Sequence, residues 1–368
     1  MRRFISGREL NRLYYSEAVA PIISSDFPKL RYGAALIGPG SDVLGYDSER
    51  STDHGWGPRL LLFLAQDDLH SIARSLSERL SGRLPATYRG FATSFANPIN
   101  GVEKTEPAAA GRVAHSVEIR SLRDFVRGML NIDLALPLKN VDWMLMPQEQ
   151  LLEITSGEVY RDDFGELAQL RETLAWYPRD VWILLMAAGW KRIAQEEPFV
   201  GRCGESGDEL GSRIVCARIV RDLVRLSFLI ERRYAPYSKW LGTAFSRLGC
   251  APHLSGSLIG ALGADSWHER ENDLCSAYET IAGLHNDLAI TPRLDEKVRG
   301  FHDRPYRVLD AQRFSSALVE SIEDRELRQT CSTTGLIGAI DQFADSTDLL
   351  DRPELCARLA ALFTETRK

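Results

Sequence analysis

The sequence predicts an α+β domain with a small mixed sheet and flanking helices, followed by an all-α helical domain. Short apolar runs at 32–37 and 60–64 are typical of buried strands, and a glycine-rich segment separates them. Beyond Leu151 long stretches follow the helical period of about 3.6 residues, and strand-like alternation disappears. With 368 residues, 44% of them apolar, the chain is long enough for two domains, which we place at 1–150 and 151–368.

The elements of the first domain follow from its patterns in chain order. A helical pattern opens the chain at 7–23, and an amphipathic segment at 75–84 predicts a second helix after the two strands. Residues 84–114 are rich in Pro, Gly, Asn and Ala, which is typical of a long loop. The alternating segment 113–119 predicts a third strand, and this strand carries Glu118.

The second domain consists of predicted helices. Residues 181–188 are apolar on every side, which predicts a buried helix. Between residues 213 and 234 an apolar stripe runs beside a stripe of arginines, which is usually the solvated face of a helix. This second stripe consists of Arg218, Arg221, Arg225 and Arg232. Further helices are predicted at 266–285, 312–322 and 353–363.

The net charge, the length of the apolar runs and the cysteine spacing limit which binding partners and which cellular compartment are expected. A formal net charge of −6 gives no general attraction to nucleic acid, so a long polynucleotide is not expected as a ligand. No run approaches the roughly 18 apolar residues that span a bilayer, and residues 1–9 lack an apolar signal core. The six cysteines are scattered without a Cys-x-x-Cys pair, which indicates reduced thiols rather than structural zinc. We therefore expect a cytoplasmic protein with no membrane partner.

The most informative segment joins a Gly-Ser turn after the first strand to a carboxylate before the second. Gly40 and Ser41 end the turn at 38–41, and Asp53 follows Ser41 by twelve residues. Glycines let a backbone approach phosphate closely, and a serine hydroxyl with free N–H groups binds phosphate oxygens. Aspartate supplies a hard oxygen ligand for Mg²⁺. This arrangement predicts a phosphate and metal site between two strands.

The same segment resembles the Gly-Ser and Ser-Asp-x-Asp signature of the DNA polymerase β nucleotidyltransferase superfamily, through Gly40-Ser41 and Ser51-Thr52-Asp53. Within that superfamily the chain resembles a bacterial nucleotidyltransferase-like family of unknown function, whose usual string here is Ser-Thr-Asp-His-Asp-Trp-Gly. The similarity to this family extends through residues 175–182, 195–201, 232–240, 284–286 and 301–305.

The resemblance implies transfer of a nucleoside monophosphate from a nucleoside triphosphate, with ATP as the first candidate, to a hydroxyl or amine. The acceptor would be a small molecule or a protein side chain, Mg²⁺ the cofactor, and the helical domain would close the cleft. The implied site consists of Asp53 and Glu118 as catalytic and metal-binding carboxylates, and of Gly40, Ser41, Lys239 and Arg232 around the triphosphate.

Gly55 departs from the family pattern, because the superfamily has its second metal-binding carboxylate at this position. One alternative is therefore a catalytically weakened nucleotide-binding protein with a regulatory or scaffolding role. Another is that Asp47 or Glu49 supplies the missing oxygens. A third is an enzyme of another type that uses the carboxylates of Asp47, Glu49 and Asp53 for metal-dependent hydrolysis and needs no nucleotide. The plainest alternative makes Asp53 a turn-capping residue and Glu118 an exposed strand residue.

Overall fold

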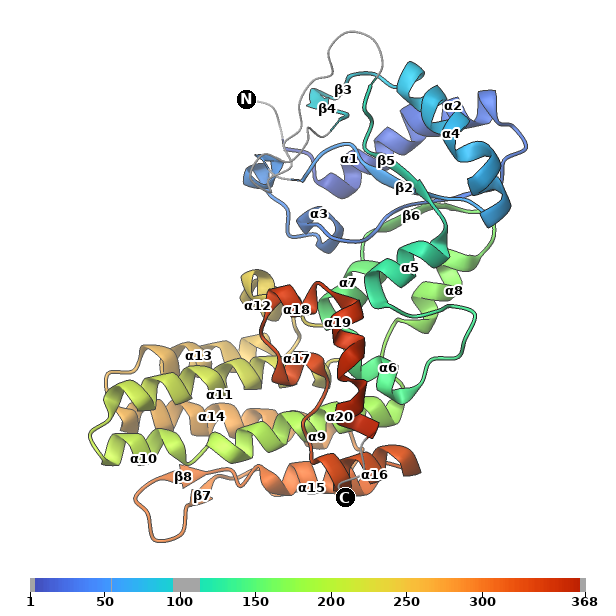
Figure 1. The fold of residues 1–368 in the computed structure, drawn as a ribbon. Coiled ribbons are helices and arrows are strands. Elements are labelled where there is room, and N and C mark those ends of the chain that lie inside the picture. The colour runs from blue at the N-terminus through green and yellow to red at the C-terminus, as the bar shows by residue number, and fades with distance from the viewer. Residues whose placement is uncertain (1–3, 54, 95–112, 365–368) are drawn as a thin grey trace. The chain divides into compact units, whose positions relative to one another are not determined.

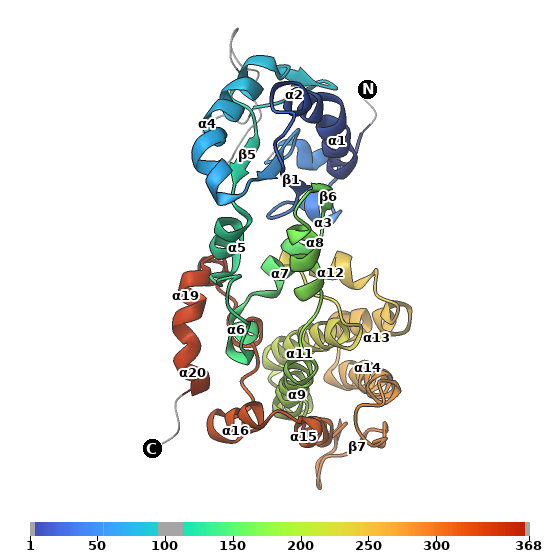
Figure 2. The same ribbon diagram turned by 90° about the vertical axis from the view of Figure 1, so that its right-hand side faces the viewer.

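The computed structural model describes residues 4–53, 55–94 and 113–364, which form two compact units. The first unit comprises Met1–Pro137 and Gln150–Ala175, and the second comprises Leu138–Glu149 and Trp176–Lys368. The chain thus enters the second unit, returns to the first and leaves it again, whereas the sequence analysis placed a single boundary after residue 150. Figures 1 and 2 show the elements of each unit.

A four-stranded mixed sheet organises the first unit, in the order β5-β2-β1-β6 (Figure 1). Its strands are β1 (Gly33–Leu36), β2 (Leu60–Phe63), β5 (Val117–Arg120) and β6 (Glu158–Asp162). β1 is antiparallel to β2 and β6, and β2 is parallel to β5. The three predicted strands are confirmed, but the expectation that strands end at Leu151 is wrong. The side chains of β6 are half-buried or exposed, as suits an edge strand, so its sequence lacks the pattern of a buried one.

The N-terminal helix predicted at 7–23 is confirmed, with a π-helical turn in its middle. It consists of α1 (Gly7–Tyr14), the π-helix Tyr15–Val19 and α2 (Ala20–Asp26). The other helices of the first unit are α3 (Ser41–Leu44), the 3-10 helix Glu49–Asp53, α4 (Gln66–Arg83), α5 (Leu122–Leu130) and α8 (Glu166–Thr173), while α7 (Gln148–Thr155) begins in the second unit and ends in the first.

The segment predicted as a long loop after α4 contains a short hairpin, β3 (Thr87–Tyr88) paired with β4 (Phe91–Ala92). Arg89 and Gly90 between them have φ values of +49° and +86°, which is the geometry of a type I′ turn. Residues 95–112 of the predicted loop lie outside the described residues.

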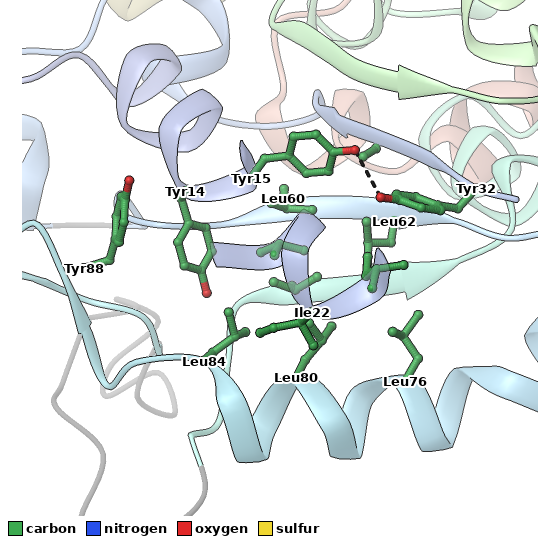
Figure 3. Close-up of a cluster of buried hydrophobic side chains, with 14 of the residues drawn as sticks. Tyr14, Tyr15, Ile22, Tyr32, Leu60, Leu62, Leu76, Leu80, Leu84 and Tyr88 are labelled. Atoms are coloured by element: carbon green, nitrogen blue, oxygen red, sulfur yellow. Dashed lines mark hydrogen bonds between the residues drawn. The ribbon is translucent and has the colours of Figure 1, made fainter. Parts of the chain in front are cut away.

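The core of the first unit lies between the sheet and helix α4 (Figure 3). Leu60 and Leu62 of β2 are buried, while Leu61 between them is only half-buried, as the alternation of a strand requires. Leu76 and Leu80 of α4 are fully buried in the same cluster. Each such side chain contributes about 2 kcal/mol by burial. One face of β2 therefore lies in the core of the first unit.

The second unit is helical, and its short strands β7 (Arg299–Gly300) and β8 (Arg307–Val308) form a separate pair. Its longest helices are α9 (Arg179–Glu196), α11 (Glu209–Ile230) and α14 (Trp267–Asp287), and α9 packs against α11 and α15 (Figure 1). The others are α6 (Asn140–Leu145), α10 (Phe199–Glu205), α12 (Ser238–Phe245), α13 (Ala251–Gly263), α15 (Gln312–Ser321), α16 (Arg325–Thr334), α17 (Ile340–Phe343), α18 (Thr347–Leu350), α19 (Pro353–Ala357), the 3-10 helix Arg358–Ala360 and α20 (Ala361–Thr364). The helices predicted from periodicity are confirmed.

None of the helices within 4–53, 55–94 and 113–364 combines the length and the apolar character that crossing a bilayer requires.

Candidate functional site

A cavity of about 430 Å³ lies in the first unit, at the end of the sheet where β1 leaves it and β2 and β5 enter it. The three strands meet there because β1 is antiparallel to β2 and β2 is parallel to β5. Its volume falls in the range of small-molecule sites, about 300–1,000 Å³. The lining consists of Ala35, Leu36, Ile37, Arg59, Leu60, Leu61, His115, Ser116, Val117 and Glu118.

The predicted Gly-Ser turn follows β1 directly. Gly38 and Gly40 have φ values of +94° and +145°, a region that favours glycine, and Ser41 begins α3. The N–H of Gly38 donates to the carbonyl of Glu153 at 3.0 Å, which ties the turn to α7. Neither Gly40 nor Ser41 is among the described residues that line the cavity, so their contact with phosphate stays a prediction.

Arg59 joins this turn to the start of β2. Its Nε and Nη2 atoms donate to the two carboxylate oxygens of Asp42 at 3.3 and 2.8 Å, and Nη2 also donates to the Pro39 carbonyl at 2.9 Å. The backbone N–H of Arg59 donates to Asn11 Oδ1 at 2.6 Å. Arg59 was not among the residues predicted for the site, although a cation directly before an apolar strand and close to a Gly-Ser turn was a usable signal.

Asp53 is the last residue of the 3-10 helix Glu49–Asp53, and its side chain, like all of His54, lies outside what the structure describes. Its role as a metal ligand therefore stays a prediction. Gly55 has a φ of +57°, and no atom lies within 4 Å of the place that a Cβ would take. A side chain thus has room at position 55, at the cost of a left-handed backbone.

Asp47, one of the carboxylates considered as a replacement ligand, is engaged in the structure. Its Oδ2 atom accepts hydrogen bonds from the backbone N–H of Gly7 at 2.7 Å and from Trp56 Nε1 at 3.0 Å. Through these contacts Asp47 fastens the start of α1 to the segment that precedes β2. This structural role speaks against Asp47 as the substitute for a carboxylate at position 55.

Glu118 lies on β5 opposite Leu61 of β2, and lines the cavity. Its side chain is 58% exposed, and Oε1 accepts a hydrogen bond from Arg120 Nη1 at 2.9 Å. A base or a metal ligand at this position would have to exchange that arginine for substrate or metal. The predicted place of Glu118 at the site is thus compatible with the fold, whereas its chemical role stays a prediction.

His115 gives the cavity a neutral polar wall. Its Nδ1 accepts the N–H of Val117 at 3.2 Å, so the proton lies on Nε2, which is 3.2 Å from the Ser77 carbonyl oxygen. Burial lowers the pKa of His115 below its ordinary value, which keeps the ring uncharged at neutral pH. The fixed ring holds the chain as it enters β5.

The described residues do not complete a site for Mg²⁺. Nowhere in the described part of the chain do three His, Cys, Asp or Glu side chains gather in a way that could hold a metal ion. Glu118 is the carboxylate among the described residues of the cavity lining, and a two-metal site needs several carboxylate oxygens at short range.

The two predicted cations of the helical domain belong to the second unit. The guanidinium of Arg232 lies 4.2 Å from the ring centroid of Trp182, and the residue has a φ of +53°. Lys239, in the first turn of α12, is exposed, and its ammonium lies 5.0 Å from the ring centroid of Trp240. Their assignment to the triphosphate stays a prediction.

Comparisons with known proteins add a family match and one distant structure. A model of the domain of unknown function DUF4037 matches residues 143–241. The crystal structure of a nucleotidyltransferase-like protein from Exiguobacterium sibiricum 255-15 is similar over 86% of this chain and 89% of that chain, with 11% identity and a TM-score of 0.32. A similarity this distant carries no inference about this chain. No curated protein matches.

Proposed function

We propose that the first unit binds a nucleoside triphosphate in the cavity at the sheet end, and that the protein transfers the nucleoside monophosphate to a hydroxyl or amine. The observation that supports this proposal is that Arg59 and Glu118 line one cavity of about 430 Å³, within the size range of small-molecule sites, and that Arg59 also donates a hydrogen bond to the turn after β1. Gly40 and Ser41 would bind phosphate, and Asp53 and Glu118 would hold Mg²⁺ or accept the proton of the acceptor.

ATP is the first nucleotide to test, and the acceptor is a small molecule or a protein side chain. Lys239 and Arg232 are proposed to bind the triphosphate. Bound Mg²⁺ would neutralise the phosphate charge. The described residues do not complete the ligand set of this ion.

Nucleotide binding without turnover is the second candidate, for a regulatory or scaffolding protein. Gly55 favours it, since no carboxylate stands where the superfamily pattern has one. The pairing of Glu118 with Arg120 favours it as well, because this carboxylate already has a cation partner.

The test is calorimetric titration of each nucleoside triphosphate with Mg²⁺ and with EDTA, followed by incubation with a metabolite extract. We expect Mg²⁺-dependent binding and, for a transferase, a product heavier by one nucleoside monophosphate. Asp53→Asn should weaken the Mg²⁺-dependent binding, and Glu78→Gln is the matched control, because Glu78 pairs with Arg74 on the surface of α4 and does not line the cavity. No binding of any nucleotide would refute the proposal, and binding without product would favour the second candidate.

A further inference from the structure

The side chains of Arg59 and Asp42 form an ion pair, the clasp, that lies against the Gly-Ser turn. Arg59 contacts Pro39 on one side of the turn and Asp42 on the other, so one guanidinium spans the residues that flank Gly40 and Ser41. The Asp42 side chain is only 2% exposed and that of Arg59 is 20% exposed. The anion of the clasp is therefore buried, whereas its cation is partly exposed to solvent.

The glycine at position 40 is explained by this clasp. A Cβ on Gly40 would overlap Asp42 Oδ1 and Arg59 Nη2, so the ion pair in this position requires glycine at position 40. The backbone N–H of Arg59 is held by Asn11, whose Nδ2 donates to the Gly7 carbonyl at 2.9 Å. Arg59 is therefore positioned from the main chain and from the side chain at once.

Arg59 has donor capacity beyond the clasp. Nε and Nη2 are engaged, whereas Nη1 has no hydrogen-bond partner among the described residues. Arg59 also lines the cavity, whose other ionisable lining residues are the neutral His115 and the anionic Glu118. A planar guanidinium suits the oxygens of a phosphate, and a prearranged one loses little side-chain freedom on binding.

We propose that Arg59 is the residue that recognises the phosphate of the ligand, and that Asp42 is the positioning residue that aims it. The proposal rests on the proposed function for the identity of the ligand as a nucleotide. The phosphate recognition itself needs only the clasp and the cavity. Arg59→Gln should thus weaken binding of phosphate groups and leave binding of the nucleoside unchanged.

The experiment measures binding of inorganic tripolyphosphate, ATP and adenosine to the full chain by calorimetry. Loss of hydrogen bonds to a charged group predicts a drop in tripolyphosphate and ATP affinity on the order of 10- to 100-fold in Arg59→Gln. Arg83→Gln is the matched control, because Arg83 pairs with Asp26 in the same unit and does not line the cavity. Adenosine affinity should be the same in both variants.

Two further variants separate recognition from folding. Arg59→Gln leaves Asp42 buried without its cation, so the double variant Asp42→Asn with Arg59→Gln should recover thermal stability without recovering tripolyphosphate affinity. Arg59→Lys keeps the charge but cannot make both clasp contacts, and should bind with intermediate affinity. Recovery of tripolyphosphate affinity in the double variant, or equal loss for adenosine, would overturn the proposal.

The outcomes distinguish this inference from the proposed function. Wild-type protein that binds tripolyphosphate through Arg59 but no nucleotide would refute the proposed function and support the phosphate site. Protein that binds ATP equally well with and without Arg59 would refute only the role of Arg59.

Discussion

Arg59 with Asp42 in the first unit and Arg192 with Asp222 in the second are similar ion pairs in different surroundings. The shortest N–O distances are 2.8 and 3.2 Å, and both aspartates are buried. Arg59 of the first pair lines a cavity of about 430 Å³, whereas both residues of the second pair line one of about 20 Å³, room for about one water molecule. The space beside an ion pair, more than the pair itself, distinguishes a candidate ligand site from a polar core.

The arginines of α11 extend the contrast. Arg218 pairs with Glu196, Arg221 pairs with Asp345, and Arg225 donates to the carbonyl of Asp341. The stripe that looked like a solvated face is thus bound to other parts of the second unit. These cations hold helices and the C-terminal segment together, while Arg59 lines a cavity and its Nη1 has no hydrogen-bond partner among the described residues.

The largest expected effect is on the catalytic rate of the candidate site in the first unit. In the proposed nucleotidyltransferase, Gly55→Asp supplies a carboxylate where the resemblance leads us to expect one, and should raise nucleotidyl transfer by on the order of 10³-fold, or about 4 kcal/mol. The left-handed φ should cost about 1 kcal/mol of stability, as measured by urea unfolding. Gly55→Asn has the same shape and a similar tolerance of this φ, and should show that cost without the gain. Equal transfer rates in the two variants would contradict the assignment.

The next largest effect is a loss of stability in the first unit, caused by a substitution that strains its backbone. A Cβ on Gly157 would overlap the carbonyl oxygen of Leu36 at the end of β1, and φ is +69°. Gly157→Ala should lower the free energy of unfolding by about 3 kcal/mol, through overlap and backbone strain together. Gly165→Ala is the control, because its φ of +74° is similar and the surrounding space is open. A cost of about 1 kcal/mol is expected there, and equal losses would show that the overlap relaxes.

A smaller loss of unfolding free energy is expected from substitutions in the second unit. Asp222→Ala removes the carboxylate partner of Arg192 and should cost about 2 kcal/mol of unfolding free energy, less than a fully buried pair because Arg192 is partly exposed. Asp345→Ala removes the exposed partner of Arg221 and should cost about 0.5 kcal/mol. Both variants should bind tripolyphosphate as wild type does, and weakened binding would contradict the separation of roles.

Another small effect depends on pH. Burial, with the nearby Asp351 and Asp341, raises the pKa of Glu149 in the second unit from 4.5 to about 7. The folded state therefore holds its proton more tightly, so the stability from Glu149 is complete below pH 4.5 and is lost as pH rises through 7. Glu149→Gln should stabilise the protein by about 1 kcal/mol at pH 8, a value reduced for solvent screening, with little effect near pH 4.5.

Glu17 in the first unit should behave in the opposite way. Its hydrogen bond from Tyr88, aided by Arg89, lowers its pKa. Its stabilising contribution is present above the ordinary pKa of 4.5 and is lost as pH falls through the lowered value. Glu17→Gln should thus lower the melting temperature at neutral pH and not in acid. The same pH trend for both variants would contradict these assignments.

Much of the fold was predictable because its signals are local. The apolar runs that became β1 and β2 and the all-round apolar segment within α9 carry their periodicity in neighbouring residues. The Gly-Ser turn was predictable for the same reason, since glycine at φ values near +94° has few substitutes. Glu118 could be placed on a strand, and its strand does enter the sheet beside β2.

Other features depend on partners distant in the chain, and no local pattern specified them. β6 is a strand because β1 offers it an open edge, and the contact of Gly157 with Leu36 is compatible only with glycine. Arg59 reaches Asp42 only after the turn and β2 have come together, and Asp47 finds Gly7 forty residues away. Sequence periodicity records which face of an element is buried, whereas the pairing of charges and strand edges follows from packing. The chain therefore displayed a Gly-Ser turn in its sequence, and only the folded sheet brought Arg59 to that turn and placed Arg59 and Glu118 at one cavity.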